Sequence, residues 1–523
     1  MAEQFNQRLL WLQQDNHAAH LCDGLRGLEK ESLRVAKSGG IAQTPHPQSI
    51  GSALANPWIT TDYSEALCEF ITPPLDNSED VLCFLQDVQT FVYRHLHDEK
   101  LWATSMPCIL NGGDNIPLAV YGNSNAGTMK TVYRRGLGYR YGRVMQVISG
   151  VHFNYSLPQS FWHLYHQAFG QALAHRDFVD QHYMGAVRNV QRYGWIIPYL
   201  MGASPAVCKS FFGDRDCELD VFDTSTFYEP YATSLRMGDI GYQNSKEEGL
   251  GIKADYSSLS SYINALRRAI STPAKLWQEI GVEVDGQWRQ LNANILQIEN
   301  EYYSTVRPKA QMNGMDKPIN ALRDKGISYI ELRSLDVNAY HPLGINQSQL
   351  DFLEVFIIYC VLQESPVIHS EERREIDENL LMVAHKGRTP LLKLKRQGGY
   401  YALKDWGLEL LEDMRQVAVL MDRAKQSSQY VKVVEAQRPL FENPDLTPSA
   451  VMLREMREHG EGFYAFANRM SQAHHSYFTA APIGRERLQM LEASVKASWL
   501  KQRQIEAADT MNFADFMRWY EAQ

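Results

Sequence analysis

Two glutamates, Glu29 and Glu31, stand two residues apart in Leu25–Val35, which reads LRGLEKESLRV. Residues two apart share a face of a β-strand, so both carboxylates are predicted on one face with apolar neighbours, opposite the basic residues of the segment. Like charges side by side are costly to bury unless a positive group compensates, and a divalent cation such as Mg2+ takes carboxylate oxygens readily. The pattern fits a metal site, and it fits equally a solvated strand face whose acids meet lysines from elsewhere in the chain.

A second acidic group follows later in the sequence. Asp62 precedes residues 66–72, which read ALCEFIT and have Glu69 at their centre. As a strand, this segment places Glu69 on a face with apolar residues. A helix would instead place Glu65 and Glu69 one turn apart, but the aromatic and β-branched residues before Pro73 favour the strand.

Two more segments carry polar side chains with the alternation of a strand. Residues 148–156 place His152 on a polar face, and residues 327–335 place Glu331 and Arg333 on one face. Alone, these side chains have ordinary structural explanations, namely a hydrogen-bonded histidine and an ion pair. Separate strands that each supply acids to one sheet face are, however, a recurring way to bind magnesium and a nucleotide. More acids than one ion requires indicate several ions holding a polyphosphate, and phosphoryl transfer also uses an arginine.

The common nucleotide-binding motifs are absent from the sequence. Residues 122–127 have the glycine spacing of a P-loop, but Thr128 and Met129 follow where lysine and serine or threonine are required. Residues 136–142 miss the dinucleotide fingerprint by one position. A bound nucleotide must therefore be held by metal ions and arginines. The basic, tyrosine-rich run 130–143 could grip single-stranded RNA, but in an acidic chain it fits better as a receptor for a small carboxylate-bearing substrate.

The composition is that of an ordinary globular protein. The 523 residues are 44% hydrophobic with a net charge of -9 and a pI of about 6.0, which argues against a nucleic-acid or anionic-membrane binder. The seven cysteines are scattered without a metal-binding spacing, no signal peptide is evident, and the apolar stretches are too short to cross a bilayer. We therefore expect a cytoplasmic protein with reduced thiols, no nucleic-acid partner and no membrane association.

The pattern of apolar residues and chain breaks changes near residue 345. Residues 1–345 mix alternating segments, helices and many Gly, Pro and Asn breaks, and are predicted to form an α+β catalytic part. Residues 346–523 are predicted to form a mostly helical part packed on it, because apolar residues recur at helical spacing in segments 349–362, 406–424 and 449–470. We interpret this helical part as a packing and support layer without chemistry of its own.

Together these segments resemble the proteobacterial glutamate–cysteine ligases, also called γ-glutamylcysteine synthetases. The resemblance rests on the order and spacing of many short motifs and covers nearly the whole chain. The motifs are RGLEKESLRV at 26–35, GSAL at 51–54, WITTDYSEALCEFITP at 58–73, ISGVHFNYS at 148–156, IPYLMGASP at 197–205, YATSLR at 231–236, LQIENEYY at 296–303, YIELRSLD at 329–336, FENPDLT at 441–447 and IEAADT at 505–510.

The resemblance implies a glutamine synthetase-like fold: a curved, largely antiparallel sheet with flanking helices, whose concave face holds ATP and metal ions. It also implies the reaction. ATP phosphorylates the γ-carboxylate of glutamate, and the amine of cysteine attacks the acyl phosphate to give γ-glutamylcysteine, ADP and phosphate, the first step of glutathione synthesis. Mg2+, or Mn2+ in its place, is the expected cofactor, and ATP is the co-substrate.

The resemblance also assigns roles residue by residue. The expected metal ligands are Glu29, Glu31, Asp62, Glu69, His152 and Glu331. Arg333 would contact the transferring phosphoryl group, and Arg236 the glutamate carboxylate. Five residues would form the cysteine pocket, namely Tyr133, Arg134, Gln146, Tyr242 and Tyr303, and Tyr63 stands beside them where a phenylalanine is common.

Two alternatives stay open beside this interpretation. The nearest is a related carboxylate–amine ligase with another amine acceptor. The alternative from a different class is a non-enzymatic scaffold that binds metal or RNA. The family also implies feedback inhibition by glutathione, which shares the γ-glutamyl and cysteinyl groups, and we expect a monomer.

Overall fold

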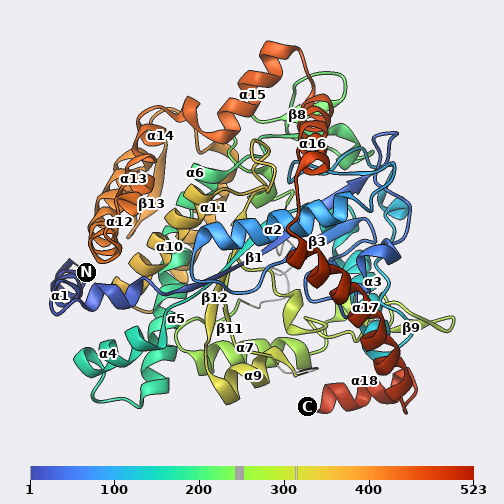
Figure 1. Ribbon diagram of the computed structural model, residues 1–523, viewed down its shortest axis with the longest axis horizontal. Helices are drawn as coiled ribbons and strands as arrows, with labels where there is room; N and C mark the ends of the chain where they lie inside the picture. The colour runs from blue at the N-terminus through green and yellow to red at the C-terminus, as the bar shows by residue number, and fades with distance from the viewer. Residues whose placement is uncertain (1, 242–252, 313, 315) are drawn as a thin grey trace.

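A computed structural model describes residues 2–241, 253–312, 314 and 316–523. At its centre lies a seven-stranded sheet whose strands pair antiparallel throughout (Figure 1). The strand order is β11 (Val306–Lys309), β12 (Tyr329–Leu335), β5 (Val151–Ser156), β1 (Leu25–Val35), β3 (Leu67–Ile71) and β2 (Ile59–Thr61), and β4 (Lys100–Leu101) pairs with β1. The four strands predicted from alternation are β12, β5, β1 and β3, and they are direct neighbours in this order.

The register of these strands brings the predicted functional residues onto one face of the sheet. Directly paired residues of antiparallel strands lie side by side on the same face. Glu31 pairs with Glu69, Glu29 pairs with His152, and Glu331 pairs with Asn154. The acids from separate strands therefore converge, each on the strand face that the alternation predicted for it.

The opposite face of β1 is buried under helices. Helix α2 (Ser78–Tyr93) packs on β1 and β3, and α10 (Gln347–Leu362) lies beside it in the same layer. The basic residues of β1 point into this layer and each has a polar partner: Arg26 with Glu354, Arg34 with Glu99, and Lys30 with Gln89. Because these cations are satisfied on their own side, they do not neutralise the acids on the other face.

The remaining elements surround this sheet. The other helices are α1 (Ala2–Gln13), α3 (Asn125–Tyr141), α4 (Gln159–Phe169), α5 (His175–Tyr193), α6 (Ile196–Met201), α7 (Leu259–Ser271), α8 (Lys275–Gln278), α9 (Pro318–Lys325), α11 (Ser370–Lys386), α12 (Leu403–Lys425), α13 (Gln429–Glu435), α14 (Arg438–Glu442), α15 (Pro448–His459), α16 (Phe463–Ala480), α17 (Arg485–Ala508) and α18 (Phe513–Ala522). Small sheets are formed by β6 (Ala206–Cys208), β8 (Thr226–Tyr228) and β7 (Asp220–Val221), by β9 (Glu283–Val284) and β10 (Gln287–Trp288), and by β13 (Lys393–Arg396) and β14 (Gly399–Ala402).

The residues after 345 are mostly helical, as predicted. Segment 349–362 is α10 and segment 406–424 lies in α12, whereas segment 449–470 spans two helices. Helix α15 ends before Gly460, which adopts a left-handed conformation with φ of 63° that glycine tolerates best. The hydrophobic core includes residues from both sides of the predicted boundary, such as Phe153 and Phe356. The division at residue 345 therefore stays a prediction.

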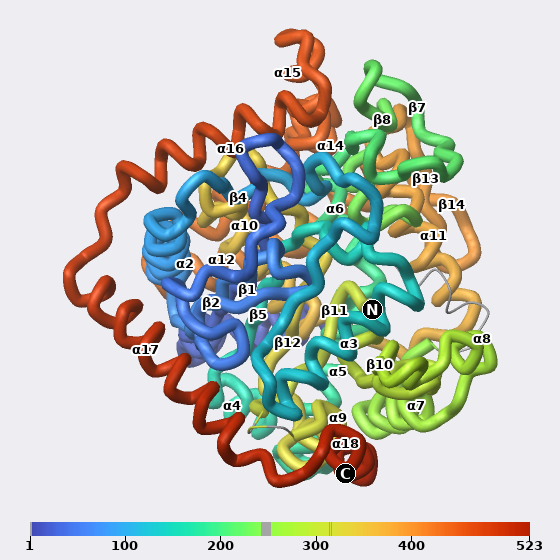
Figure 2. The backbone as a smooth tube through the Cα atoms, turned by 90° about the vertical axis from the view of Figure 1, so that its right-hand side faces the viewer, coloured from blue at the N-terminus to red at the C-terminus, as the bar shows by residue number. Residues whose placement is uncertain are grey.

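Helices α17 and α18 form a long arm at the end of the chain. Figure 2 shows α17 running along one side of the molecule from α16 to α18. The arm is attached to the first part of the chain, because Ser52 N donates to Ser498 Oγ at 3.0 Å and Asn123 N donates to Glu506 Oε1 at 3.0 Å. Among the described helices, none is both long and apolar enough to cross a membrane.

Candidate active site

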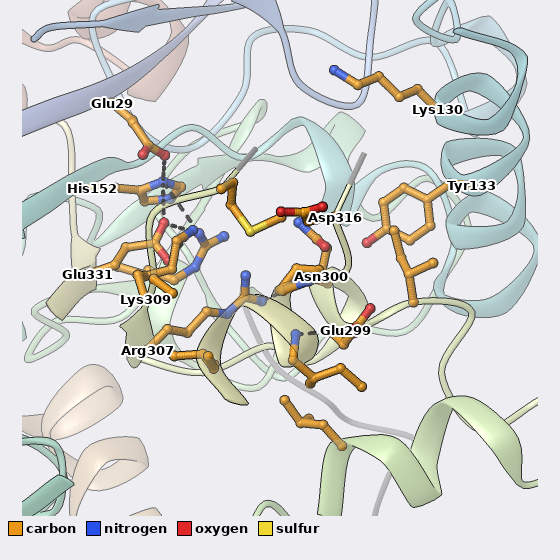
Figure 3. A pocket seen from close by; sticks show the side chains of 18 of the residues that line it. Glu29, Lys130, Tyr133, His152, Glu299, Asn300, Arg307, Lys309, Asp316 and Glu331 are labelled. Atoms are coloured by element: carbon orange, nitrogen blue, oxygen red, sulfur yellow. Dashed lines mark hydrogen bonds and ion pairs between the residues drawn. The ribbon is translucent and has the colours of Figure 1, made fainter. Parts of the chain in front are cut away.

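A cavity of about 430 Å3 lies over the acidic face of the sheet. Figure 3 shows Glu29, His152 and Glu331 on one side of it, with Lys130 and Tyr133 of α3 on the other. Nine of the residues predicted from the sequence line this cavity: Glu29, Glu31, Asp62, Glu69, Tyr133, Arg134, His152, Glu331 and Arg333. The strands and α3 thus bring together side chains that lie far apart in the sequence.

His152 lies at the centre of the acidic group because β5 runs between β1 and β12. Its Nδ1 is 3.2 Å from Glu29 Oε2 and 3.7 Å from Glu331 Oε1, and its Nε2 is 3.9 Å from Glu31 Oε1. One possible ligand atom from each of Glu29, His152 and Glu331 lies within 4.8 Å of the other two. Mg2+ binds oxygen at about 2.0–2.1 Å, so two ligand atoms of one ion lie at most about 4.2 Å apart, and small side-chain shifts would let these three residues share one cation.

Glu331 is 1% exposed and lies among cations. Arg333 Nη1 is 2.8 Å from Glu331 Oε1, and Lys309 Nζ is 3.4 Å from Glu331 Oε2. Burial alone would raise the pKa of Glu331, but Lys309 and Arg333 hold this pKa well below its usual range. The guanidinium of Arg333 also reaches to 3.5 Å from His152 Nδ1, so it faces the centre of the acidic group.

A second part of the acidic group has a surplus of negative charge. Glu31 and Glu69 are paired across β1 and β3, and Asp62 follows β2 beside them. Burial raises the pKa of Glu31, and burial together with Glu29, Asp62 and Glu31 raises the pKa of Glu69 well above its usual range. Glu29 differs, because burial raises its pKa but the hydrogen bond with His152, together with the charges of His152 and Lys309, lowers this pKa below its usual value. Crowded, partly buried carboxylates of this kind are the ligands that a divalent cation prefers.

Three basic residues that the sequence analysis did not single out also line the cavity, namely Lys130, Arg307 and Lys309. Arg307 and Lys309 are alternate residues of β11, and Arg307 pairs with Glu331, so both lie on the acidic face, although the strand is too short for its alternation to be visible in the sequence. Lys130 precedes Arg134 by one helical turn on α3, within the basic run 130–143. Acids from three strands and from the residue after β2 thus meet cations from β11, β12 and α3, an arrangement suited to metal ions and phosphate groups.

Three predicted residues surround the cavity without lining it. Tyr303 Oη donates to Gln146 Oε1 at 2.8 Å, so these two members of the predicted cysteine pocket contact each other. Arg236 is 2% exposed and donates from Nη2 to the backbone oxygen of Arg333 at 2.8 Å. Arg236 therefore supports the strand that carries Arg333, and the predicted roles of all three stay predictions.

Two predicted residues remain, Tyr242 and Tyr63. Tyr242 lies outside the described residues. Tyr63 is 1% exposed, and its hydroxyl lies against α3, where a Cβ atom at Gly138 would be 2.5 Å away. Among the described residues this hydroxyl has no hydrogen-bond partner, and burial raises the pKa of Tyr63.

A family model described as glutamate–cysteine ligase matches residues 9–383. The chain belongs to the glutamate–cysteine ligase family. Glutamate–cysteine ligases of Pseudomonas putida KT2440 and Azotobacter vinelandii DJ are 44% and 45% identical to it over 522 and 525 residues, which is 100% of this chain and 99% of each relative. The resemblance inferred from the sequence motifs is confirmed.

Two solved structures share the fold. A glutamate–cysteine ligase of Francisella tularensis, crystallised in complex with AMP, is 32% identical and superposes with a TM-score of 0.90 over 96% of this chain and 98% of that chain. A bifunctional glutathione synthetase of Pasteurella multocida, 23% identical, has a similar fold with a TM-score of 0.67 over 89% of this chain and 53% of that chain. The predicted class, a glutamine synthetase-like α+β fold with a largely antiparallel sheet and a helical C-terminal part, is confirmed.

Proposed function

We propose that the protein joins the γ-carboxylate of L-glutamate to the amine of L-cysteine at the expense of ATP, giving γ-glutamylcysteine, ADP and phosphate. This is the first step of glutathione synthesis. The observation that carries the assignment is the family match over most of the chain. The cavity adds the chemistry, because it combines clustered carboxylates with an arginine that faces them.

The acidic group fits a divalent cation. Oε2 of buried Glu331 accepts no hydrogen bond from the described residues, and the paired acids Glu31 and Glu69 both have raised pKa values. We propose six ligands for Mg2+, or for Mn2+ in its place: Glu29, Glu31, Asp62, Glu69, His152 and Glu331. Bound there, the metal would neutralise the phosphate oxygens of ATP. Six ligand side chains exceed what one ion with bound water and phosphate requires, so more than one ion is expected.

Arg333 is the proposed contact of the transferring phosphoryl group. In the first step an oxygen of the glutamate γ-carboxylate bonds to the γ-phosphorus of ATP, and the bond to ADP breaks. Negative charge spreads over the γ-phosphoryl oxygens in this transition state. Glu331 fixes the guanidinium of Arg333 at 2.8 Å, so the guanidinium faces the centre of the acidic group, where the phosphate would lie.

The second step uses the opposite wall of the cavity. The cysteine nitrogen bonds to the acyl carbon, phosphate leaves, and the nitrogen loses a proton. Arg134 of α3 is the proposed partner of the cysteine carboxylate, and Arg236 that of the glutamate α-carboxylate. The rest of the proposed cysteine pocket consists of Tyr63, Tyr133, Gln146, Tyr242 and Tyr303. No protein nucleophile is needed, so positioning and charge neutralisation supply the catalysis.

The other partners follow from the same reaction. ATP is proposed as the nucleotide, in line with the AMP bound by the Francisella tularensis relative. Glutathione is proposed as a feedback inhibitor, since it carries the γ-glutamyl and cysteinyl groups of the product. A monomer that acts in the cytoplasm is proposed as the working form, and the seven cysteines are free thiols in the structure.

Phosphate release tests the assignment. With Mg2+ and ATP, release should require both glutamate and cysteine, and the rate in a panel of amines should be highest with cysteine. Equal rates with other amines would instead indicate a related carboxylate–amine ligase. Glu331→Gln should abolish turnover while leaving the protein folded, and Glu371→Gln on the exposed surface of α11 is the matched control. No glutamate-dependent phosphate release from the wild type would refute the proposal.

A further inference from the structure

The last helix of the chain docks beside the cavity. Phe516, Met517 and Tyr520 of α18 pack against Met129 and Val132 of α3 in a small hydrophobic cluster. Met129 itself lines the cavity, and so does Tyr520, which is 7% exposed. Helix α18 therefore does more than cover the outside of α3, because one of its side chains reaches the wall of the candidate active site.

The final turn of α18 is also joined to the other wall. Lys317, which precedes α9, donates from Nζ to the backbone oxygen of Glu521 at 3.1 Å and lies 5.1 Å from the centre of the Tyr520 ring. Asn320 of α9 donates from Nδ2 to the backbone oxygen of Gln523 at 3.1 Å. Since Pro318, Ile319 and Leu322 of the α9 region line the cavity, α18 bridges two of its walls.

The part of the cavity beside α18 differs from the acidic part. Figure 3 places Glu299 across the cavity from Glu29 and His152. Glu299 accepts a hydrogen bond from the backbone N of Ile319 at 3.4 Å, and Nζ of Lys317, two residues before Ile319, lies 5.1 Å from the centre of the Tyr520 ring, so Tyr520 lies at this far end. Beside the polar residues Glu299, Asn300 and Asp316, the elements at this end contribute apolar and aromatic lining residues: Tyr262, Leu266, Ile298, Ile319, Leu322 and Tyr520.

The two ends of the cavity match the two ends of ATP. The triphosphate belongs with the metal-binding acids and the cations of β11 and β12, and the flat, apolar purine ring belongs with apolar and aromatic side chains. We propose that α18 forms the wall of the nucleoside end of the pocket and that Tyr520 contacts the nucleobase. This rests on the proposed function only in placing the triphosphate at the acids. It assigns a substrate-binding role to the helical C-terminal part, which the sequence suggested was only a support layer.

Equilibrium binding of nucleotides to the full-length protein tests this inference without relying on turnover. Tyr520→Leu keeps an apolar side chain but removes the ring, and Trp519→Leu makes the same kind of change at a neighbouring position that is 45% exposed and does not line the cavity. Titration calorimetry with Mg2+ should show about tenfold weaker binding of the non-hydrolysed analogue AMP-PNP to Tyr520→Leu. Binding to Trp519→Leu should change less than twofold.

Inorganic tripolyphosphate separates a base contact from a general structural effect. Its affinity should be the same for wild type, Tyr520→Leu and Trp519→Leu, because it has no base to meet Tyr520. Equal weakening of tripolyphosphate and the nucleotide, an unchanged nucleotide affinity in Tyr520→Leu, or the same loss in Trp519→Leu would each overturn the inference. Failure of the ligase assignment would be visible separately, as wild-type protein that binds the nucleotide but releases no phosphate with glutamate and cysteine.

Discussion

Glu69→Gln tests whether the acids form a metal site, because the substitution should stabilise the metal-free protein and should also reduce the stabilisation by Mg2+. Glu69 and Glu31 are paired residues of neighbouring antiparallel strands, and Glu31 is 7% exposed. Two carboxylates about 5 Å apart repel by about 3 kcal/mol at an effective dielectric constant of about 20, and water near half-buried Glu69 reduces this to about 1–2 kcal/mol. Removing one charge should raise the free energy of unfolding by that amount in EDTA.

The increase in the free energy of unfolding caused by Glu69→Gln should depend on pH in a defined direction. The folded-state pKa of Glu69 is raised above the ordinary glutamate value of 4.5, so the unfolded chain releases this proton first as the pH increases. The metal-free wild type therefore loses stability from about pH 4.5 up to the raised pKa, and above it the cost is fully present. The stabilisation by Glu69→Gln should accordingly be small in acid and largest in alkaline buffer.

Magnesium should reverse the order of stability. At a concentration of one hundred times its Kd, Mg2+ would stabilise the wild type by about 2.7 kcal/mol, whereas the variant has lost one proposed ligand and should gain much less. Denaturant unfolding in EDTA and in saturating MgCl2 measures the stability without metal and the stabilisation by Mg2+. The exposed substitution Glu371→Gln is the control that should change neither quantity. A variant that is less stable than the wild type in EDTA, or that gains as much from Mg2+, would refute the metal-site reasoning.

Three other substitutions have defined outcomes. Arg333→Lys should lower kcat about a hundredfold with little change in the unfolding midpoint, because lysine cannot donate to Glu331 and to a phosphoryl group in the same fork, and equal kcat values would contradict this role. Burial lowers the pKa of Lys30 to about 7, so the unfolded state binds more protons than the folded state between about pH 7 and 10.5. The free energy of unfolding should therefore rise in this range by up to about 1.4 kcal/mol per pH unit. Lys30→Met should remove this slope, which unfolding curves at a series of pH values will measure. Tyr63→Phe should stabilise the protein by about 1 kcal/mol, since it removes a buried hydroxyl that has no hydrogen-bond partner among the described residues, and a destabilised variant would show that this hydroxyl is satisfied in solution.

Strand alternation predicted most of the acidic site because the period of a strand is a local property. Leu25–Val35 is long enough to show it, and the assignment of Glu29 and Glu31 to one face needed no knowledge of the partners of β1. The pairing of β1 with β3 and β5 is a long-range property, so the sequence did not show that Glu31 would lie opposite Glu69. The family resemblance supplied this convergence indirectly, by naming the ligands together.

The residues that the sequence analysis missed belong to elements with weak local signals. Strand β11 has four residues and contains Pro308, so Lys309 gave no visible alternation. Tyr520 reaches the cavity because a long arm carries α18 back to α3 and α9, and no periodicity in α18 indicates where that helix docks. The sequence analysis predicted a mostly helical part after residue 345 but named no helix at 513–522 and said nothing of its place beside the cavity.

The central claim, that carboxylates of β1, β3 and β12 and of Asp62 hold the metal of an ATP site, is tested most directly by locating the metal. Crystals grown with Mn2+, the analogue AMP-PNP and glutamate would give anomalous difference peaks at bound manganese. The account predicts peaks within about 2.0–2.4 Å of carboxylate oxygens of Glu29 and Glu331 and of at least one of Glu31 and Glu69, with phosphate oxygens completing the coordination. Nucleotide bound in the cavity with no peak near these acids, or with manganese held elsewhere, would contradict the account.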